Sequence, residues 1–268
     1  MRIFLFGSNG MAGNYIKKYL SYQNKTVIGL TRNDVDLNQS YEKLNAFLHG
    51  ILQVQSTDII INAAGIIKQR NSSMNQMINV NSIFPQVLGD IKDSKGCNVI
   101  HISTDCVFSG RQGGYIESDL CDSIDDYGKT KSLGEHSSLT TIRTSLIGEE
   151  RNYKKSLLEW VKTKHKVIIP GYENHFWNGI TCIELAKVID KIINDKLYWE
   201  GPTHIFSPRI ITKYELVNMI NNQYQLGNLV EPTLHDIRCD RSLQTKYNSI
   251  IQISPIEEQI EYQKKIGY

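Results

Sequence analysis

Short apolar runs recur along the first half of the chain, separated by segments whose apolar residues follow helical spacing. The runs are almost continuously apolar, which is typical of strands buried on both faces. Buried strands that alternate with helices predict a parallel sheet covered by helices on both sides. The predicted strands span residues 2–6, 26–30, 58–61, 99–103 and 141–143, and the predicted helices span residues 14–20, 41–48, 75–88 and 127–136.

The regular alternation weakens after about Leu146. Helical patterns continue at residues 156–164, 183–193 and 214–222, but irregular stretches that contain proline separate them. We therefore expect an α/β protein with a Rossmann-type doubly wound parallel sheet in residues 1–148. Residues 149–268 should mainly form a smaller C-terminal lobe, with some segments returning to pack on the sheet domain.

Composition and charge exclude several classes of partner. With 30 Lys and Arg against 28 Asp and Glu, the 268-residue chain has a formal net charge of +2, so no global field favours nucleic acid or an acidic membrane surface. The five cysteines show no metal-ligand spacing. No apolar stretch approaches the roughly 20 residues of a membrane span. We expect a cytoplasmic protein without a metal site and without a membrane or nucleic-acid partner.

A glycine-rich turn, Gly7-Ser-Asn-Gly10-Met-Ala-Gly13, follows the first predicted strand and begins the first helix. Free N–H groups and the helix dipole at such a turn favour a pyrophosphate, and glycine permits close backbone approach. The spacing differs from the commonest dinucleotide motif, and a purely structural turn is the alternative. The expected cofactor contacts here are Gly7, Asn9, Gly10, Met11 and Gly13.

The end of the second strand bears on the choice of cofactor. An acidic residue there binds the ribose 2′-hydroxyl of NAD, whereas a basic residue accommodates the 2′-phosphate of NADP. The sequence Leu30-Thr31-Arg32 favours NADPH, although Asp34 and Asp36 follow closely and NADH remains the alternative. The expected contacts from this strand and from the end of the third are Thr31, Arg32, Asp36, Leu37, Asn62, Ala63, Ala64 and Gly65.

A set of proton-transfer residues follows the fourth strand. Tyr127 and Lys131 are four residues apart, which places them on one face of a helix. We expect the Lys131 ammonium to lower the pKa of the Tyr127 phenol, so that the phenol can give a proton to a ketone oxygen during hydride transfer. Thr104 should align that oxygen, and Ser103 should border the cofactor together with Tyr127 and Lys131.

The motifs together resemble the extended short-chain dehydrogenase/reductase superfamily, and more narrowly its dTDP-4-dehydrorhamnose reductase (RmlD-like) group. The resemblance is dense in the first half and thins to short pieces such as WNGIT and DRSL in the second. It rests on GSNGMAG at residues 7–13, INAAGIIKQ at 61–69, STDCVFSGRQGGYIESD at 103–119, YGKTKSLGE at 127–135 and IRTSLIGEE at 142–150.

The resemblance implies a function and a site. The reaction would be NADPH-dependent reduction of a 4-keto-6-deoxy sugar linked to a nucleoside diphosphate, with Thr104, Tyr127 and Lys131 as the catalytic triad. The C-terminal lobe would bind this substrate. UDP or dTDP as the nucleotide, a 2-acetamido group on the sugar and a homodimeric assembly are left open. The expected substrate contacts are Lys68, Thr104, Asp105, Trp177 and Arg241.

Two alternatives remain. Cys106 precedes an aliphatic-aromatic pair where related epimerase/reductases place a cysteine, so its thiolate could remove a proton beside the keto group, with His175 or Lys166 as partner acid. An ordinary buried cysteine is the other interpretation. A dehydratase is disfavoured because position 106 lacks a carboxylate. An NADP-binding regulatory subunit is the alternative of another class, and catalytic turnover distinguishes it from an enzyme.

Overall fold

A six-stranded parallel sheet is the centre of the protein, as shown by a computed structural model that describes residues 1–67, 72–152, 154–248 and 251–266. The strand order is β10-β5-β4-β3-β1-β2. This arrangement confirms the α/β, Rossmann-type fold predicted from the sequence. The strands are β1 (Ile3–Phe6), β2 (Val27–Leu30), β3 (Ile59–Asn62), β4 (Asn98–Ile102), β5 (Thr140–Arg143) and β10 (Gly201–His204).

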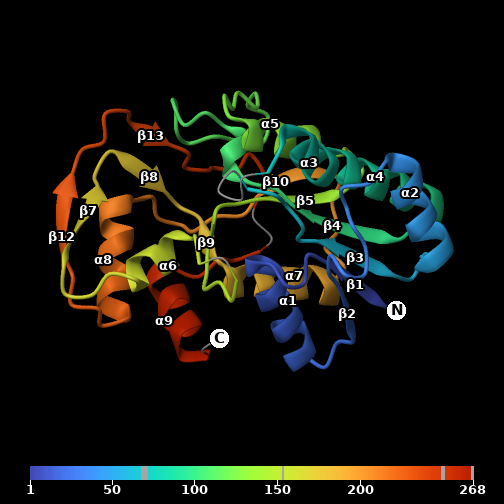
Figure 1. Cartoon of the computed structure of the whole chain (residues 1–268), viewed down its shortest axis with the longest axis horizontal. Coiled ribbons are helices and arrows are strands. Elements are labelled where there is room, and N and C mark those ends of the chain that lie inside the picture. The colour runs from blue at the N-terminus through green and yellow to red at the C-terminus, as the bar shows by residue number, and fades with distance from the viewer. Residues whose placement is uncertain (68–71, 153, 249–250, 267–268) are drawn as a thin grey trace.

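Helices cover both faces of the sheet (Figure 1). Successive residues of β1 point to opposite faces, so Ile3 and Leu5 pack in one core while Phe4 and Phe6 pack in the other. This explains why the strands are continuously apolar. One face carries α1 (Met11–Tyr22) and α7 (Cys182–Asn194), and the other carries α2 (Tyr41–Ala46), α3 (Met74–Ile78), α4 (Phe84–Lys95) and α5 (Asp126–Leu133).

The helix predicted at residues 75–88 is longer and less regular than expected. A π-helical segment, η3 (Asn79–Ile83), separates α3 from α4, and another, η1 (Phe47–Ile51), follows α2. Pro85 in the first turn of α4 has no N–H to give to the helix, which fits an interruption at this point. Gly96, at φ 70°, ends α4 in the left-handed conformation.

The second lobe is built from short strands and helices around a core of its own (Figure 1). The sequence pattern did not predict α9 or most of the short strands, because periodicity is weak over two to five residues. Its elements are β6 (Leu146–Ile147), β7 (Ile168–Tyr172), β8 (His175–Trp177), β9 (Ile180–Thr181), β11 (Ile211–Thr212), β12 (Leu229–Thr233), β13 (Cys239–Asp240), α6 (Leu157–Lys162), α8 (Lys213–Gln223) and α9 (Ile256–Ile266).

Segments far apart in the sequence join the two lobes. β10, from the second half of the chain, pairs with β5, and Tyr115 forms a bridge with Leu243. The boundary between residues 148 and 149 therefore stays a prediction. Within the described part of the chain, no helix is both long and apolar enough to cross a membrane.

Candidate active site

The glycine-rich turn brings β1, α1 and the end of β3 into close contact. Gly7 has φ +75°, and a Cβ there would lie 2.7 Å from the backbone nitrogen of Ala64. A Cβ on Gly13 would lie 2.2 Å from the Gly7 carbonyl oxygen. Gly10 is the N-cap of α1 and provides no side-chain cap, so the first N–H groups of this helix are left for another acceptor. This cradle fits a pyrophosphate.

The residues after β2 form a tight turn around Asp34. Its carboxylate accepts hydrogen bonds from the Thr31 backbone N–H, at 2.8 Å, and from the Thr31 hydroxyl, at 2.7 Å. These bonds hold the pKa of Asp34 below its usual value. Arg32 is exposed beside this turn. Lys17, which the sequence analysis did not single out, is a second cation here, since a Cβ on Gly29 of β2 would lie 3.1 Å from its Nζ.

Two further predicted contacts have other roles in the turn. Asp36 accepts hydrogen bonds from the Asn38 backbone and the Gln39 side chain. Leu37 packs against the small core cluster that contains Ile66. Both lie close to the predicted adenosine end, but their side chains are held by the protein itself.

The end of β3 is organised by buried amides. Asn62 donates to His101 Nδ1, at 3.1 Å, and accepts from the Ala64 N–H. Burial keeps the pKa of His101 well below its usual value, so the ring is neutral and can accept this bond. Ala63, Ala64 and Gly65 are only half-buried, which leaves the strand end open to a ligand.

Asn81 on η3 is a second organising amide, and the sequence analysis missed it. It hydrogen-bonds with both the N–H and the C=O of Ile66, and it also donates to Thr130 Oγ1. Thr130 belongs to α5, so Asn81 joins the predicted cofactor loop to the helix that carries Tyr127 and Lys131. A helical asparagine gives no sequence signal that distinguishes this role from a surface position.

The structure brings Thr104, Tyr127 and Lys131 together at the carboxyl ends of the strands. Thr104 caps the 3₁₀ turn η4 (Asp105–Val107) and hydrogen-bonds with the Tyr127 hydroxyl. Lys131 is 3% exposed and donates to the carbonyl oxygen of Ile102, at 2.7 Å. A Cβ on Gly128 would lie 2.0 Å from the Cys106 carbonyl, so glycine lets α5 pack directly on η4.

The electrostatics of the triad correct one expectation. Burial raises the pKa of Tyr127 above its ordinary value, and the Lys131 charge does not reverse this. The reason is that Lys131 is itself buried and directed to Ile102, and burial lowers its own pKa to about 8. Tyr127 is therefore a neutral phenol at neutral pH. That state suits a residue that donates a proton.

A buried charge network stands next to Lys131. Glu135 lies one helical turn after it and makes a two-pronged ion pair with Arg143, with distances of 2.9 and 2.6 Å. The Ser103 hydroxyl donates to the same carboxylate, at 2.6 Å, so the predicted cofactor contact of Ser103 has its hydroxyl committed to Glu135. The Glu135 charge raises the pKa of Lys131 against the effect of burial.

The other wall of the site comes from the second lobe. Arg241 donates to the Phe108 carbonyl, at 2.9 Å, and approaches the Cys106 sulfur at 3.7 Å. Lys213, at the start of α8, interacts electrostatically with Asp105, Cys106 and Arg241. The sequence analysis did not predict Lys213, because a single lysine in a helical pattern is usually a surface charge.

Trp177, a predicted substrate contact, is 3% exposed. Its ring lies against Lys213, with the ammonium 5.0 Å from the ring centroid. The protein therefore covers most of Trp177, which leaves little of it for direct contact with a sugar. Lys68, another predicted contact, lies outside the described residues.

Cys106 has the surroundings of a neutral thiol. Burial and the neighbouring Asp105 raise its pKa to about 12, although Arg241 opposes the shift. Of the two suggested partner acids, His175 is close enough to Lys213 and Arg241 for their charges to lower its pKa, together with burial. Lys166 is exposed and lies beside the loop at Leu226 and Gly227.

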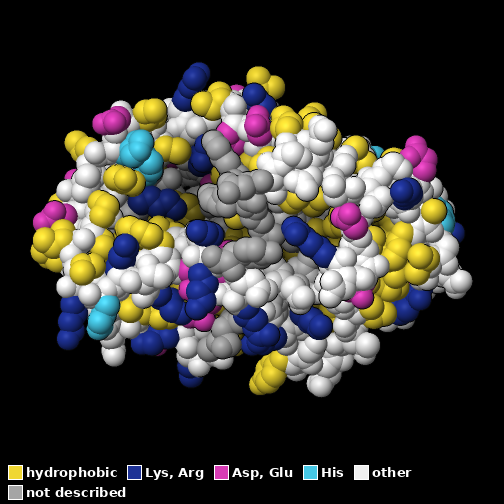
Figure 2. All heavy atoms as spheres, in the orientation of Figure 1, with side chains coloured by type: hydrophobic (Ala, Val, Ile, Leu, Met, Phe, Trp, Pro, Cys, Tyr) yellow, Lys and Arg dark blue, Asp and Glu magenta, His cyan; other side chains and the backbone are white. Residues whose placement is uncertain are grey.

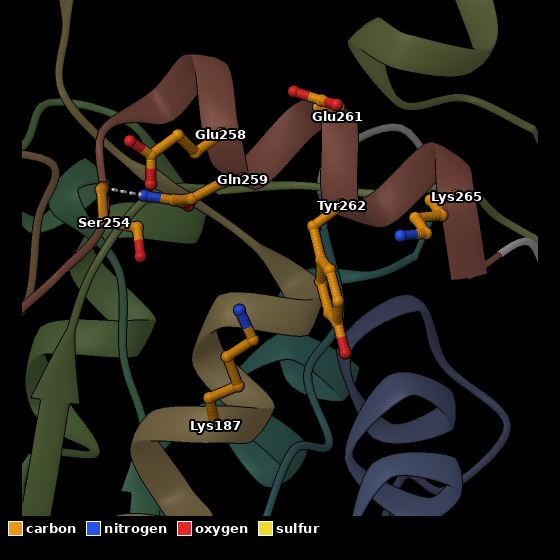
Figure 3. A pocket seen from close by; sticks show the side chains of 7 residues that line it. All are labelled: Lys187, Ser254, Glu258, Gln259, Glu261, Tyr262 and Lys265. Carbon is orange, nitrogen blue, oxygen red and sulfur yellow. Dashed lines mark hydrogen bonds between the residues drawn. The ribbon is translucent and has the colours of Figure 1, made fainter.

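A cavity of about 280 Å³ lies elsewhere, between α7 and α9 (Figure 3). Lys187 reaches toward Tyr262 across it, with 4.1 Å between the ammonium and the ring centroid. Gln259 donates to the Ser254 carbonyl at its edge. None of the predicted site residues lines this cavity. Among the described residues no cluster of His, Cys, Asp or Glu could hold a metal ion.

Comparison with known proteins agrees with this geometry. The family model described as the RmlD substrate binding domain matches residues 1–265. This chain belongs to the RmlD substrate binding domain family. A curated relative, the dTDP-4-dehydrorhamnose reductase of Aggregatibacter actinomycetemcomitans, is 25% identical over 244 residues, which cover 86% of this chain and 81% of the relative.

Solved RmlD structures share the fold. A dTDP-4-dehydrorhamnose reductase from Clostridium acetobutylicum has a TM-score of 0.81 at 24% identity, with 99% of each chain covered. The Bacillus anthracis enzyme of the same name, solved in complex with NADP, has a TM-score of 0.80 at 20% identity, with 99% of each chain covered. The resemblance to the RmlD-like group found in the sequence is confirmed.

Proposed function

We propose that this RmlD-family protein reduces the keto group at C4 of a 4-keto-6-deoxy sugar linked to a nucleoside diphosphate. Thr104, Tyr127 and Lys131 lie at the carboxyl end of the sheet, the end at which β1 leads into the turn of Gly7 and Gly13, and this arrangement is the observation that carries the proposal. Membership of the family supports the general class: the chain is a nucleotide-sugar reductase, an NADP-dependent oxidoreductase of the extended short-chain type.

The protein groups have distinct roles in the proposed reaction. NADPH supplies the hydride that reduces the carbonyl carbon. Tyr127 gives its proton to the carbonyl oxygen, and Thr104 orients that oxygen through the hydrogen bond that it shares with the phenol. Lys131 holds the cofactor ribose. Its ammonium also stabilises the phenolate that forms when Tyr127 gives up its proton.

The cofactor residues favour NADP over NAD. The exposed Arg32 and the neighbouring Lys17 provide two cations near the end of β2, where the 2′-phosphate would lie. Asp34 is the nearest acidic group, but its carboxylate is occupied by Thr31. NADH is the alternative cofactor. Relative affinities for NADPH and NADH, measured in the wild type and in Arg32→Ala, test this choice.

The nucleotide is proposed as dTDP, since the relatives are named for dTDP-linked sugars, with UDP as the alternative. The bifunctional epimerase/reductase with Cys106 is the weaker alternative, because burial keeps that thiol protonated.

The deciding experiment follows NADPH oxidation at 340 nm with dTDP- and UDP-linked 4-keto-6-deoxy sugars, with and without a 2-acetamido group. NMR of each product shows which centre was reduced and whether a neighbouring centre was inverted. Turnover with one of these substrates establishes the reductase. Tight NADPH binding without oxidation in any of them would contradict the proposal and favour the regulatory-subunit alternative.

A further inference from the structure

Lys213 is a half-buried cation at the wall of the site. Its ammonium lies over the Trp177 ring. Among the described residues, no carboxylate lies within 4.0 Å of it to form an ion pair. Burial lowers the pKa of Lys213 to about 8, although the Asp105 charge opposes this effect. An ammonium removed from water without a close partner is costly, so a bound anion would stabilise it.

Arg241 is a second cation on the same wall. Its side chain is 26% exposed, and its nearest carboxylate, Asp125, is 3.9 Å away and itself 31% exposed. Within the described residues, its guanidinium donates one short hydrogen bond, from Nε to the Phe108 carbonyl, and a longer one to the Cys106 sulfur. The guanidinium therefore keeps N–H groups that a planar anion could engage.

Two carboxylates lie near this wall, but within the described residues neither forms a close ion pair with Lys213 or Arg241. Asp105 is 5% exposed and directly follows Thr104; burial raises its pKa, and the charges of Arg241 and Lys213 act in the opposite direction. Figure 2 shows Lys and Arg side chains gathered around the middle of the molecule, where the lobes meet. Among the described residues, no close carboxylate occupies the ammonium of Lys213 or the guanidinium of Arg241.

The two cations lie near the residues that are proposed to react with the sugar. Asp105 and Cys106 directly follow Thr104, and Thr104 shares a hydrogen bond with Tyr127. We propose that Lys213 and Arg241 form an anion-binding pair in the sugar pocket, which takes a negatively charged group of the nucleotide sugar. This inference rests on the proposed function.

The anion has two chemical sources. One is the diphosphate that every nucleotide sugar carries next to the ring. The other is a carboxylate on the sugar itself, in place of the methyl group of a 6-deoxy sugar. Both present paired oxygens that an arginine and an ammonium can share.

The test combines binding and turnover. Calorimetric titration with dTDP and with UDP, in the presence of NADP⁺, compares the wild type, Lys213→Met and Lys213→Arg. Steady-state kinetics then compare a 4-keto-6-deoxy sugar nucleotide with a 4-keto uronate nucleotide. Lys191→Met, on the exposed side of α7, is the matched control, and NADP⁺ affinity verifies that each variant is folded.

The two sources give different results. If the diphosphate is bound, Lys213→Met weakens dTDP or UDP by about 10-fold or more, and Lys213→Arg restores most of the affinity. If a carboxylate is bound, nucleotide affinity is unchanged, the wild type prefers the uronate, and Lys213→Met raises KM for that substrate alone. Unchanged nucleotide affinity together with no selective KM effect overturns the inference.

A wild type that reduces no keto sugar refutes the proposed function, while the nucleotide titration still shows whether Lys213 binds the diphosphate.

Discussion

The two walls of the site are assembled in different ways. The proposed catalytic wall comes from one stretch of chain, residues 103–135, which follows β4 and contains η4 and α5. The proposed substrate wall combines Lys213 from the start of α8 and Arg241 from the segment after β13, and the ring of the buried Trp177 in β8 lies against Lys213. Local spacing is therefore enough to place the proposed proton-transfer groups, whereas the residues proposed to meet the substrate depend on how the second lobe folds against the first.

The walls also differ in how their charges are balanced. Lys131 is next to a closed network in which Glu135, Arg143 and Ser103 satisfy one another. Lys213 and Arg241 lack close carboxylate partners among the described residues. A closed network holds one geometry for the reaction, and an open pair of cations leaves room for a ligand.

The largest effect is expected for Tyr127→Phe, which should lower the rate of reduction but leave cofactor binding intact. Tyr127→Phe removes the proton donor but keeps most of the ring packing, so kcat should fall by about 10²- to 10⁴-fold. NADPH affinity should change little. Stopped-flow reduction and NADPH titration measure both quantities, and Tyr22→Phe, on an 82% exposed tyrosine, serves as the control. Wild-type turnover in Tyr127→Phe would remove Tyr127 from the mechanism.

The closed network should carry stability that an exposed pair does not. Glu135→Gln leaves Arg143 buried without its charged partner, so the free energy of unfolding should drop by about 3 kcal/mol or more. The control is Glu200→Gln, whose ion pair with Lys92 is exposed, and it should change stability little. Urea denaturation measures both. Equal decreases in the free energy of unfolding of the two variants would show that the buried network stabilises the protein no more than the exposed ion pair does.

The pH dependence should distinguish the two buried lysines. The pKa of Lys131 is lowered to about 8, so the residue is charged below this pH and neutral above it. The value of kcat/KM should therefore decline as the pH rises through about 8. Lys131→Arg should move this decline to higher pH because arginine stays charged. Lys213 has the same lowered pKa, and a decline that disappears in Lys213→Met instead would assign it to the substrate wall.

The smallest effect is expected at Cys106. Because its thiol has a pKa of about 12, Cys106→Ala should change the reduction rate by less than about 3-fold. NMR of product formed in deuterated water should show no Cys106-dependent label beside the reduced carbon. Label that appears in the wild type and is lost in Cys106→Ala would instead establish the epimerase alternative.

Sequence reasoning placed most strands of the parallel sheet correctly for a physical reason. A strand buried on both faces must be apolar throughout, so β1, β3 and β4 are visible as short runs. The glycines at 7 and 13 are equally visible, because only a residue without a side chain fits between α1 and the end of β3. The resemblance to the RmlD-like group depended on these same constrained segments.

Expectations about individual side chains were less secure. Ser103 has its hydroxyl directed to Glu135, Trp177 is covered, and Tyr127 has a raised pKa where the sequence predicted a lowered one. Each outcome depends on burial and on partners far away in the chain. A motif states which groups are present, but not which neighbour each of them meets.

The sequence by itself determined the parallel sheet, the glycine cradle and the spacing of Tyr127 and Lys131, because all three follow from local packing and helix geometry. Only the tertiary structure placed Asn81 between the cofactor loop and α5, and brought Lys213 to Asp105 over more than a hundred residues. The first contact depends on the packing of η3 against α5, and the second on the docking of the C-terminal lobe against the sheet. Burial at these contacts shifts the pKa values of Tyr127, Lys131 and Lys213 from their ordinary values.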